Sequence, residues 1–248
     1  MNEKKANILG FNVCTLEYNK ILTNIKNDLK NNKRNIIYNI NPLIVMNFYK
    51  DDKVINKFNE QKYNIPDGVG TVMALRMKGI SILSRIAGID FFESLLDIAA
   101  KEKYKVFLYG AKKEVVEKAC KNIEEKYCNI KIVGYTSGYE NEKKVLENIQ
   151  KAKPDMLFVA TGSPKQENFI INNEDKLKSI ILIMPVGGSF DVLSGYTKRA
   201  PKVWQKLRLE WLYRMIKEPK RIKDNIGLIK FVLLVLFRNS GIMKKEGN

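Results

Sequence analysis

Four apolar segments that alternate with helical patterns most constrain what this chain can fold into. The apolar segments span residues 104–109, 130–135, 155–160 and 180–186. The intervals between them carry apolar residues at helical spacing, at 112–126, 140–151 and 165–172. Continuous apolar strands joined by helices are typical of a parallel sheet with helices on both faces. We therefore predict the α/β class, with a mostly parallel sheet covered on both faces.

Small residues follow the carboxyl ends of three of these segments, in the turns Gly110–Ala111, Thr161–Ser163 and Gly187–Ser189. Open α/β sheets bind ligands at this edge, and glycine lets backbone N–H groups approach a phosphate. Glycine is also common in βα turns that bind nothing, and none of the three turns is a complete dinucleotide-binding or P-loop motif. Together they predict a nucleotide or sugar-nucleotide site. The residues assigned to it are Gly110, Gly162, Gly187, Gly188 and Asp191.

A further turn, within Tyr63–Thr71, combines a short apolar run, Pro66–Gly68 and a second glycine at Gly70. A helical pattern follows, so the turn joins a strand end to a helix start. The two glycines allow the backbone to approach a ligand closely, and the helix start favours anions. Asp67 is then a carboxylate at the edge of the ligand. In the alternative interpretation Asp67 only caps the helix that follows.

The N-terminal part of the chain predicts two strands and several helices. Asn41–Pro42 is a cap followed by a first-turn proline, which indicates a helix start. Thr15 is a candidate cap for an earlier helix. The expected strands are 8–13 and 35–40, and the expected helices are 16–30, 43–48, 52–61 and 89–102.

The composition limits the chemistry. The 248-residue chain contains no histidine, so a general base near neutral pH must be Asp, Glu, Lys, Tyr or Cys. The three cysteines lack a CxxC spacing and the carboxylates lack a metal-site pattern. We expect reduced thiols, no cofactor, and a metal-independent reaction in which cationic side chains and helix N-termini neutralise a leaving phosphate. No signal peptide or apolar span of about 20 residues is apparent, so we expect a cytoplasmic protein.

Residues 196–248 form a basic tail, which we separate from a body at residues 1–195. The tail carries 14 Lys/Arg and 4 Asp/Glu, in a chain whose net charge is +17. Its apolar run Ile226–Phe237 is too short to span a bilayer, but it suits a helix that lies in the interface beside anionic lipid. The alternative is a helix that packs on the body or on another subunit.

An ordered set of short motifs runs through nearly the whole chain. It comprises Asn39–Pro42, Pro66–Gly70, Arg85 with Gly88–Asp90, Gly162–Glu167, Gly187–Asp191, Arg199–Pro201, Leu209–Arg214 and Glu218–Pro219. Each piece is weak alone, but the set in this order resembles the WecG/TagA/CpsF glycosyltransferase family. The resemblance implies a Rossmann-like body with a basic, helical C-terminal appendage.

The resemblance further implies an inverting, metal-independent transfer of N-acetylmannosamine from a UDP-sugar donor to undecaprenyl-diphosphate-linked N-acetylglucosamine, in wall teichoic acid synthesis. Asp67 is the general base that it implies. The residues that it implies for substrate binding are Asn39, Asn41, Arg85, Gln166, Arg214 and Arg221. The last two would close over the site and hold diphosphate. The appendage would bring the enzyme to the cytoplasmic face of the membrane. Because subunit association can displace such an appendage, a homo-oligomer is a further hypothesis.

Two positions depart from the family pattern. Asn39 stands where the family usually has threonine, which predicts altered donor specificity. Asp224 stands where the family tends to carry arginine, which predicts weaker diphosphate binding unless Lys223 compensates.

Three alternatives remain at this point. The first is the same mechanism with another UDP-sugar, for a capsular or other surface polysaccharide. The second is a nicotinamide-dependent enzyme, which the missing GxGxxG disfavours. The third is a basic nucleic-acid-binding protein. It is disfavoured because the charge concentrates in a tail with an apolar run, so we expect no nucleic-acid partner.

Overall fold

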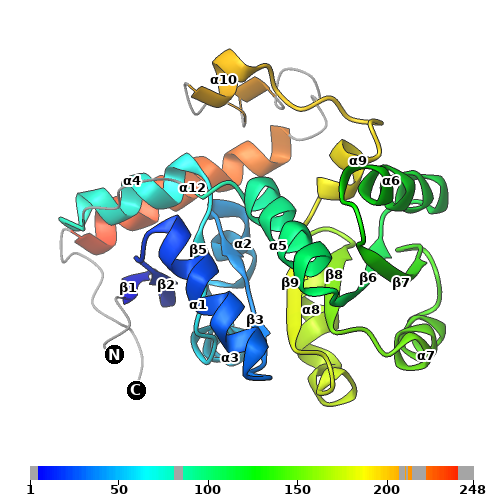
Figure 1. Cartoon of the computed structure of the whole chain (residues 1–248). Coiled ribbons are helices and arrows are strands. Elements are labelled where there is room, and N and C mark those ends of the chain that lie inside the picture. Colours follow the sequence, from blue (N-terminus) through cyan, green and yellow to red (C-terminus); the bar gives the residue numbers. More distant parts are fainter. Residues whose placement is uncertain (1–4, 81–85, 207–209, 211, 214–221, 240–248) are drawn as a thin grey trace.

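The computed structural model describes residues 5–80, 86–206, 210, 212–213 and 222–239. In this part of the chain a parallel sheet lies between two groups of helices (Figure 1). The predicted α/β class is confirmed, and the arrangement is Rossmann-like.

Five parallel strands form the central sheet, in the order β3-β9-β8-β6-β7. Their bounds are β3 Asn35–Ile36, β6 Lys105–Gly110, β7 Lys131–Thr136, β8 Met156–Ala160 and β9 Leu182–Pro185. Successive side chains of a strand point to opposite faces. Within β8, Leu157 therefore joins one buried core and Phe158 joins the other. Burial on both faces explains why the central strands are continuously apolar.

Helices cover both faces of this sheet. One core is closed by α1 Tyr18–Lys30, α5 Gly88–Glu102, α6 Lys113–Lys126 and α9 Ser189–Leu193. The other is closed by α2 Pro42–Phe48, α3 Asp52–Asn59, α4 Val69–Met77, α7 Glu142–Ala152 and α8 Lys165–Asn172. A short 3-10 helix, η1 Glu174–Leu177, follows α8, and α10 Lys202–Lys206 begins just after Pro201.

The predicted strand 35–40 is divided between two neighbours. Its first half, β3, pairs with β9, and its second half, β4 Asn39–Ile40, pairs in parallel with β5 Ile65–Pro66. Backbone hydrogen bonds also link Ile37 N–H to the Ile183 carbonyl at 2.9 Å and Ile65 N–H to the Tyr38 carbonyl at 2.8 Å. Because all these strands run in parallel, β4, β5 and β9 end along the same edge.

Two local predictions near the N-terminus are wrong. In place of one strand at 8–13, β1 Lys5–Ile8 and β2 Phe11–Cys14 form an antiparallel hairpin. The turn residues Leu9 and Gly10 both have positive φ, at +48° and +100°, as a two-residue turn of type I′ requires. The next helix, α1, is N-capped by Glu17 and not by Thr15.

The C-terminal helix α12, Ile222–Asn239, packs against α2 and α4 (Figure 1). Its Phe231 and Val235 are buried in the same core as those helices. Gly70 of α4 permits this packing, because a Cβ there would lie 2.7 Å from Pro42 and 3.2 Å from Leu228. Gly70 therefore serves helix packing, whereas the sequence predicted that it brings the backbone close to a ligand. These contacts fit the alternative interpretation of the tail, in which its helix packs on the body.

Candidate active site

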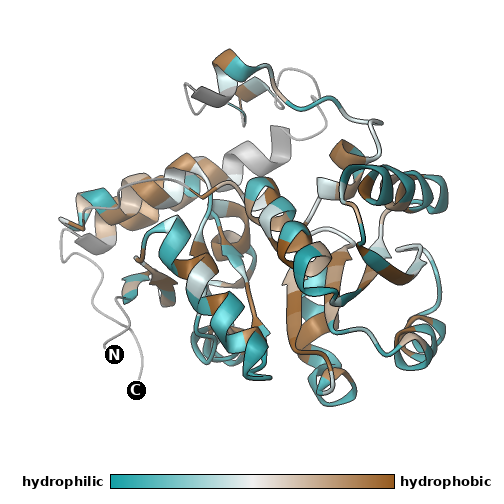
Figure 2. Cartoon of the chain, in the orientation of Figure 1, coloured by the Kyte–Doolittle hydropathy of each residue, from teal (hydrophilic) through white to brown (hydrophobic). Residues whose placement is uncertain are grey.

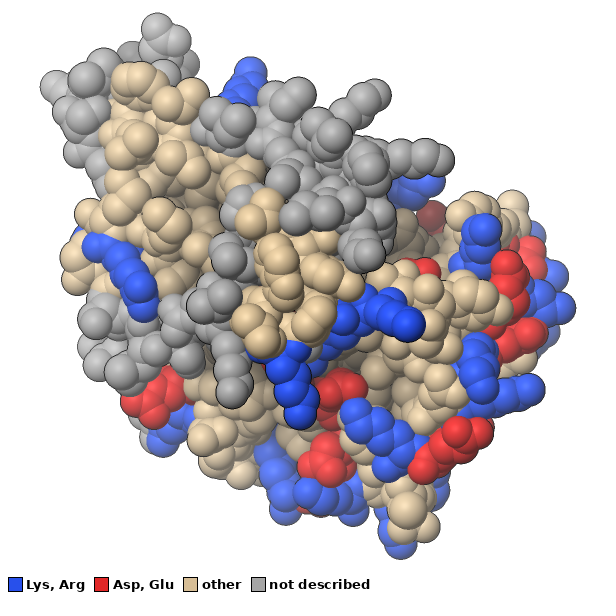
Figure 3. Space-filling view, turned by 90° about the horizontal axis from the view of Figure 1, so that it is seen from above, with Lys and Arg blue, Asp and Glu red and all other residues tan. Residues whose placement is uncertain are grey.

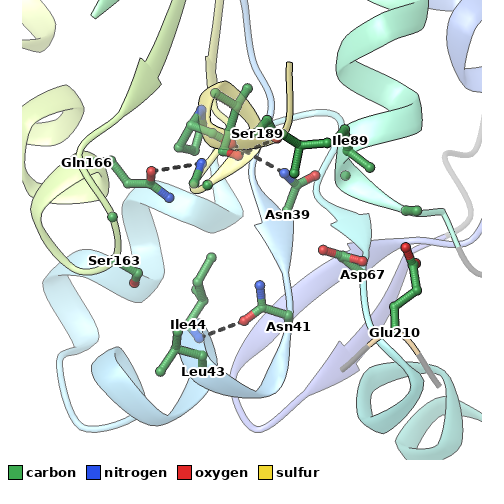
Figure 4. A pocket seen from close by; sticks show the side chains of 18 of the residues that line it. Asn39, Asn41, Leu43, Ile44, Asp67, Ile89, Ser163, Gln166, Ser189 and Glu210 are labelled. Carbon is green, nitrogen blue, oxygen red and sulfur yellow. Dashed lines mark hydrogen bonds between the residues drawn. The ribbon is translucent and has the colours of Figure 1, made fainter. Parts of the chain in front are cut away.

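A cavity of about 520 Å³ opens at the carboxyl edge of the parallel strands (Figure 4). Residues that follow β4, β5, β8 and β9 line it, together with the start of α5, residues 197–200 and Glu210. Small-molecule sites have volumes of roughly 300–1,000 Å³. The predicted site residues that line the cavity are Asn39, Asn41, Asp67, Gly162, Gln166, Gly187 and Gly188.

Asp67 directly follows β5, so the pairing of β4 with β5 determines its position. Its backbone N–H donates to the Ile40 carbonyl at 2.9 Å. Gly88, the first residue of α5, comes close to the side chain: a Cβ there would lie 3.4 Å from Asp67 Oδ2 and 2.9 Å from Asn39 Nδ2. The N-cap residue of α4 is Gly68, so Asp67 is not the cap of that helix. Asp67 thus lies on the cavity wall, and its role as a general base stays a prediction.

Asn39, at the start of β4, is one of the buried polar residues of this wall. Only 8% of it is exposed. Its Nδ2 donates to the Pro185 carbonyl at 3.3 Å, whereas Oδ1 is buried and has no hydrogen-bond partner among the described residues. A buried acceptor without a partner costs free energy, so Oδ1 is a natural point of attachment for a ligand N–H or O–H. Asn41 also lines the cavity, and its Oδ1 accepts from Ile44 N–H at 3.0 Å and caps α2, as predicted.

Gln166, in the first turn of α8, connects that helix to the loop after β9. Its Oε1 accepts from Gly187 N–H at 3.1 Å, and its Nε2 donates to Glu167 Oε1 at 2.7 Å. Gly187 and Gly162 have positive φ, at +54° and +79°, and each has open space where a side chain would be. Glycine at both positions therefore keeps the backbone of the cavity wall accessible to a ligand.

Two residues assigned to the nucleotide site, Gly110 and Asp191, are not among those that line the cavity. Gly110 ends β6, where a Cβ would lie 2.4 Å from the Ala160 backbone, so close strand packing accounts for this glycine. Asp191 belongs to α9, and its backbone carbonyl accepts from Thr197 N–H at 2.9 Å. It thereby fixes the start of the segment that borders the cavity. A nucleotide contact by either residue stays a prediction.

The C-terminal side of the cavity is held by ion pairs among Arg199, Asp90 and Glu210, which we call the Arg199 cluster. Arg199 Nη1 lies 2.7 Å from Asp90 Oδ1, in the first turn of α5, and Arg199 Nε donates to Glu210 Oε1 at 3.3 Å. Glu210 is buried, and Figure 4 shows its carboxylate in the same part of the cavity as that of Asp67. Arg199 therefore fastens the C-terminal segment to α5.

Comparison with known proteins identifies the family. The model of the glycosyl transferase WecG/TagA/CpsF family matches residues 6–245. The chain belongs to this family. Similar proteins include the N-acetylglucosaminyldiphosphoundecaprenol N-acetyl-β-D-mannosaminyltransferases of three bacteria. That of Bacillus subtilis (strain 168) is 43% identical over 202 residues, which cover 81% of this chain and 78% of the relative. Those of Bacillus spizizenii and Staphylococcus aureus (strain MW2) are 37% and 33% identical, over 84% and 98% of this chain and 81% and 95% of the relatives.

Membership of the WecG/TagA/CpsF family confirms the resemblance drawn from the motifs. It gives no support to the nicotinamide-dependent or nucleic-acid-binding alternatives. Three expected substrate-binding residues, Arg85, Arg214 and Arg221, lie outside the described residues, so their roles stay predictions. Among the residues that are described, no group of three or more potential metal ligands is present. Metal independence also stays a prediction.

Sequence reasoning missed several polar residues that line the cavity. They are Asn47, Thr197, Lys198, Arg199 and Glu210, whereas Ser163 and Ser189 belong to turns that the sequence had assigned to the site. A signal existed for the Arg199 cluster, because all three of its members belong to motifs of the family set. No role was inferred because Asp90 is distant in sequence from Arg199 and Glu210, and only the folded chain brings the three motifs together.

Proposed function

We propose that the chain is an inverting glycosyltransferase that transfers N-acetylmannosamine from UDP-N-acetylmannosamine to undecaprenyl-diphosphate-linked N-acetylglucosamine. This reaction forms the linkage unit of wall teichoic acid. The observation that carries the proposal is the cavity of this WecG/TagA/CpsF family member, in which Asp67 shares one wall with the amides of Asn39 and Gln166. The relatives from Bacillus and Staphylococcus support the choice of sugar and acceptor, because their names state both.

In the proposed reaction Asp67 is the general base. The acceptor hydroxyl oxygen attacks the anomeric carbon from the face opposite UDP, and its proton passes to the Asp67 carboxylate. The bond from the anomeric carbon to the UDP oxygen breaks, so a single displacement inverts the configuration. The absence of histidine from the chain fits a carboxylate in this role.

The leaving UDP needs positive charge at the cavity. The N-terminus of the 15-residue helix α5 contributes Gly88 and Ile89 to the lining, and helix N-termini favour anions. Lys198 also lines the cavity and adds a cationic side chain, whereas the charge of Arg199 is paired with Asp90 and Glu210. We propose that these groups neutralise the diphosphate, with help from Arg85, Arg214 and Arg221, whose positions are not described.

The acceptor lipid requires that the enzyme work at a membrane surface. Helices α4 and α12 present exposed apolar side chains next to each other, and both helices are coloured as largely hydrophobic in Figure 2. These exposed side chains are Met73 and Met77 of α4 and Val232, Leu233, Leu236 and Phe237 of α12, and we call them the apolar face. Seen from above, the described surface on this side is mostly uncharged, while Lys, Arg, Asp and Glu crowd the opposite side (Figure 3). No helix in the described part of the chain is both long and apolar enough to span a bilayer. We propose that the apolar face rests in the cytoplasmic interface of the membrane.

The proposal is tested by measuring UDP release from a panel of UDP-sugars, with a lipid-diphosphate N-acetylglucosamine acceptor and EDTA present. We expect release from UDP-N-acetylmannosamine that requires the acceptor and survives the chelator. Release only from another UDP-sugar would leave the mechanism unchanged but assign the enzyme to a different polysaccharide pathway. Asn39, which stands where the family usually has threonine, is the residue from which we predicted altered donor specificity. No release from any donor would contradict the proposal.

A further inference from the structure

The buried carboxylate of Glu167 has no part in the reaction described above. Its side chain lies in the first turn of α8 and is 0% exposed. It is not among the residues that line the cavity, but its neighbour Gln166 is. The contact between them is short, with Gln166 Nε2 donating to Glu167 Oε1 at 2.7 Å. Glu167 therefore affects the cavity through the amide of Gln166.

The two hydrogen bonds of Gln166 allow only one orientation of its amide. Gly187 N–H is a donor and must face the amide oxygen, at 3.1 Å, while a carboxylate oxygen is an acceptor and must face the amide nitrogen. A flipped amide would set N–H against N–H at Gly187 and oxygen against oxygen at Glu167. The carboxylate of Glu167 thus excludes the flipped state, which a neutral or apolar neighbour would exclude less strongly.

We propose that Glu167 is a positioning residue of the transfer reaction, which locks Gln166 so that an N–H donor of its Nε2 faces the sugar of the donor substrate. The hydrogen bonds to Gly187 and Glu167 occupy the oxygen and one N–H of the Gln166 amide. The second N–H remains for a ligand in the cavity. The matching ligand atom is an acceptor, such as a sugar hydroxyl oxygen or the carbonyl of an acetamido group. This inference rests on the proposed function.

Asn39, in β4, presents a hydrogen-bonding group of the opposite kind to the same cavity. Its Nδ2 donates to the Pro185 carbonyl and leaves Oδ1, an acceptor, without a partner among the described residues. Both amides are thus hydrogen-bonded to the backbone at the end of β9, at Pro185 and Gly187, Asn39 through its nitrogen and Gln166 through its oxygen. A ligand meets an acceptor at Asn39 and a donor at Gln166, and an acetamido sugar carries groups of both kinds.

The choice of a charged residue for this lock has a physical reason. Burial raises the pKa of Glu167, with the Gln166 amide and the Ser163 hydroxyl acting in the opposite direction. Burying a carboxylate is unfavourable unless hydrogen bonds compensate it. The bond from Gln166 favours the ionised form of Glu167, and a bond to an ionised acceptor is roughly twice as strong as a neutral one. The other carboxylate oxygen, Oε2, is buried and has no hydrogen-bond partner among the described residues.

A double-mutant cycle tests whether Glu167 acts through Gln166. We expect Glu167→Leu to raise KM for UDP-N-acetylmannosamine about tenfold, the value of one good hydrogen bond, with a smaller change in kcat. Glu167→Gln keeps a neutral acceptor, and we expect it to raise KM only about twofold to threefold. In the Gln166→Ala background neither substitution should raise KM further. An equal rise in both backgrounds, or no rise in folded Glu167→Leu, would overturn the proposal.

A ligand-free measurement separates this inference from the proposed function. The side-chain amide protons of Gln166 are followed by ¹⁵N NMR and assigned with Gln166→Glu. We expect one proton to be shifted downfield and protected from exchange in the wild type, and this signature to weaken in Glu167→Gln and Glu167→Leu. Even if the wild-type protein shows no transferase activity, this measurement tests whether Glu167 fixes the orientation of the Gln166 amide. An amide signal that neither variant changes would refute that role of Glu167. Glu167→Gln serves alone if Glu167→Leu does not fold.

Discussion

The two sides of the cavity are held by different forces. On the body side, Asn39 and Gln166 are held by hydrogen bonds to the backbone at the end of β9, at Pro185 and Gly187, and both residues are nine-tenths or more buried. On the C-terminal side, the Arg199 cluster holds the chain by ion pairs, and the Arg199 side chain is 27% exposed. Salt screens exposed charges but leaves buried neutral hydrogen bonds nearly unchanged. The body side is thus rigid, and we call it the fixed side. The contacts that hold the C-terminal side weaken as the ionic strength rises.

The largest expected effect comes from the fixed side. Asp67→Asn removes the proposed base but keeps the shape of the side chain, so we expect kcat to fall about 10² to 10⁴-fold while UDP still binds. Steady-state kinetics and calorimetric titration with UDP measure the two quantities. Asp97→Asn, on the exposed side of α5, is the control and should leave both unchanged. Near-normal turnover in Asp67→Asn would contradict the base assignment.

Gly88→Ala tests how rigid the body side is. The new methyl group would lie 2.9 Å from Asn39 Nδ2, so the Asn39 amide must move, and it would come into contact with Asp67 Oδ2 at 3.4 Å. We expect kcat/KM to fall about 10- to 100-fold, since small displacements of reacting groups are costly. Gly227→Ala has open space around it and is the matched control. Retained kcat/KM in Gly88→Ala would show that the fixed side tolerates adjustment.

Arg199→Ala tests the ion-pair side. It removes both contacts of the Arg199 cluster, each worth about 0.5 kcal/mol at a partly exposed site, so we expect KM to rise about fivefold. In the wild type, KM should also rise between 0.05 M and 0.5 M KCl, and in Arg199→Ala it should rise less. Lys121→Ala, an exposed cation on α6, controls for net charge. If KM depends equally on salt in the wild type and in Arg199→Ala, the ion pairs of Arg199 do not account for the salt dependence. The proposed difference between the two sides of the cavity would then be wrong.

The smallest expected effect concerns the apolar face. Leu233 is 46% exposed on α12, so Leu233→Glu should weaken binding to anionic vesicles about threefold to fivefold without lowering the melting temperature. Vesicle co-sedimentation measures the binding, and turnover with a water-soluble acceptor analogue should not change. Tyr139→Glu makes the same kind of change at an exposed residue before α7 and is the control. Equal losses in both variants would argue against a specific membrane face.

Much of the site was predictable because its residues follow strands. The carboxyl ends of parallel strands meet at one edge, so Asp67, Gly162 and Gly187 were assigned to one site from their places after apolar runs. Gly110 met the same criterion but does not line the cavity, since β6 lies beyond β8 in the sheet. Strand order is a property of the fold, and a turn glycine carries no information about it.

The sequence by itself determined the class of the fold, the family and the residues on the fixed side of the cavity. These depend on local patterns, namely apolar periodicity, turn glycines and short motifs, which are visible in a linear chain. Only the tertiary structure decided the rest. It joined Arg199, Asp90 and Glu210 into one cluster, set Gln166 between Gly187 and Glu167, and used Gly70 to seat α12. Apart from the bond between the neighbours Gln166 and Glu167, these contacts join residues separated in sequence, and the packing of strands and helices, which no local pattern specifies, brings them together.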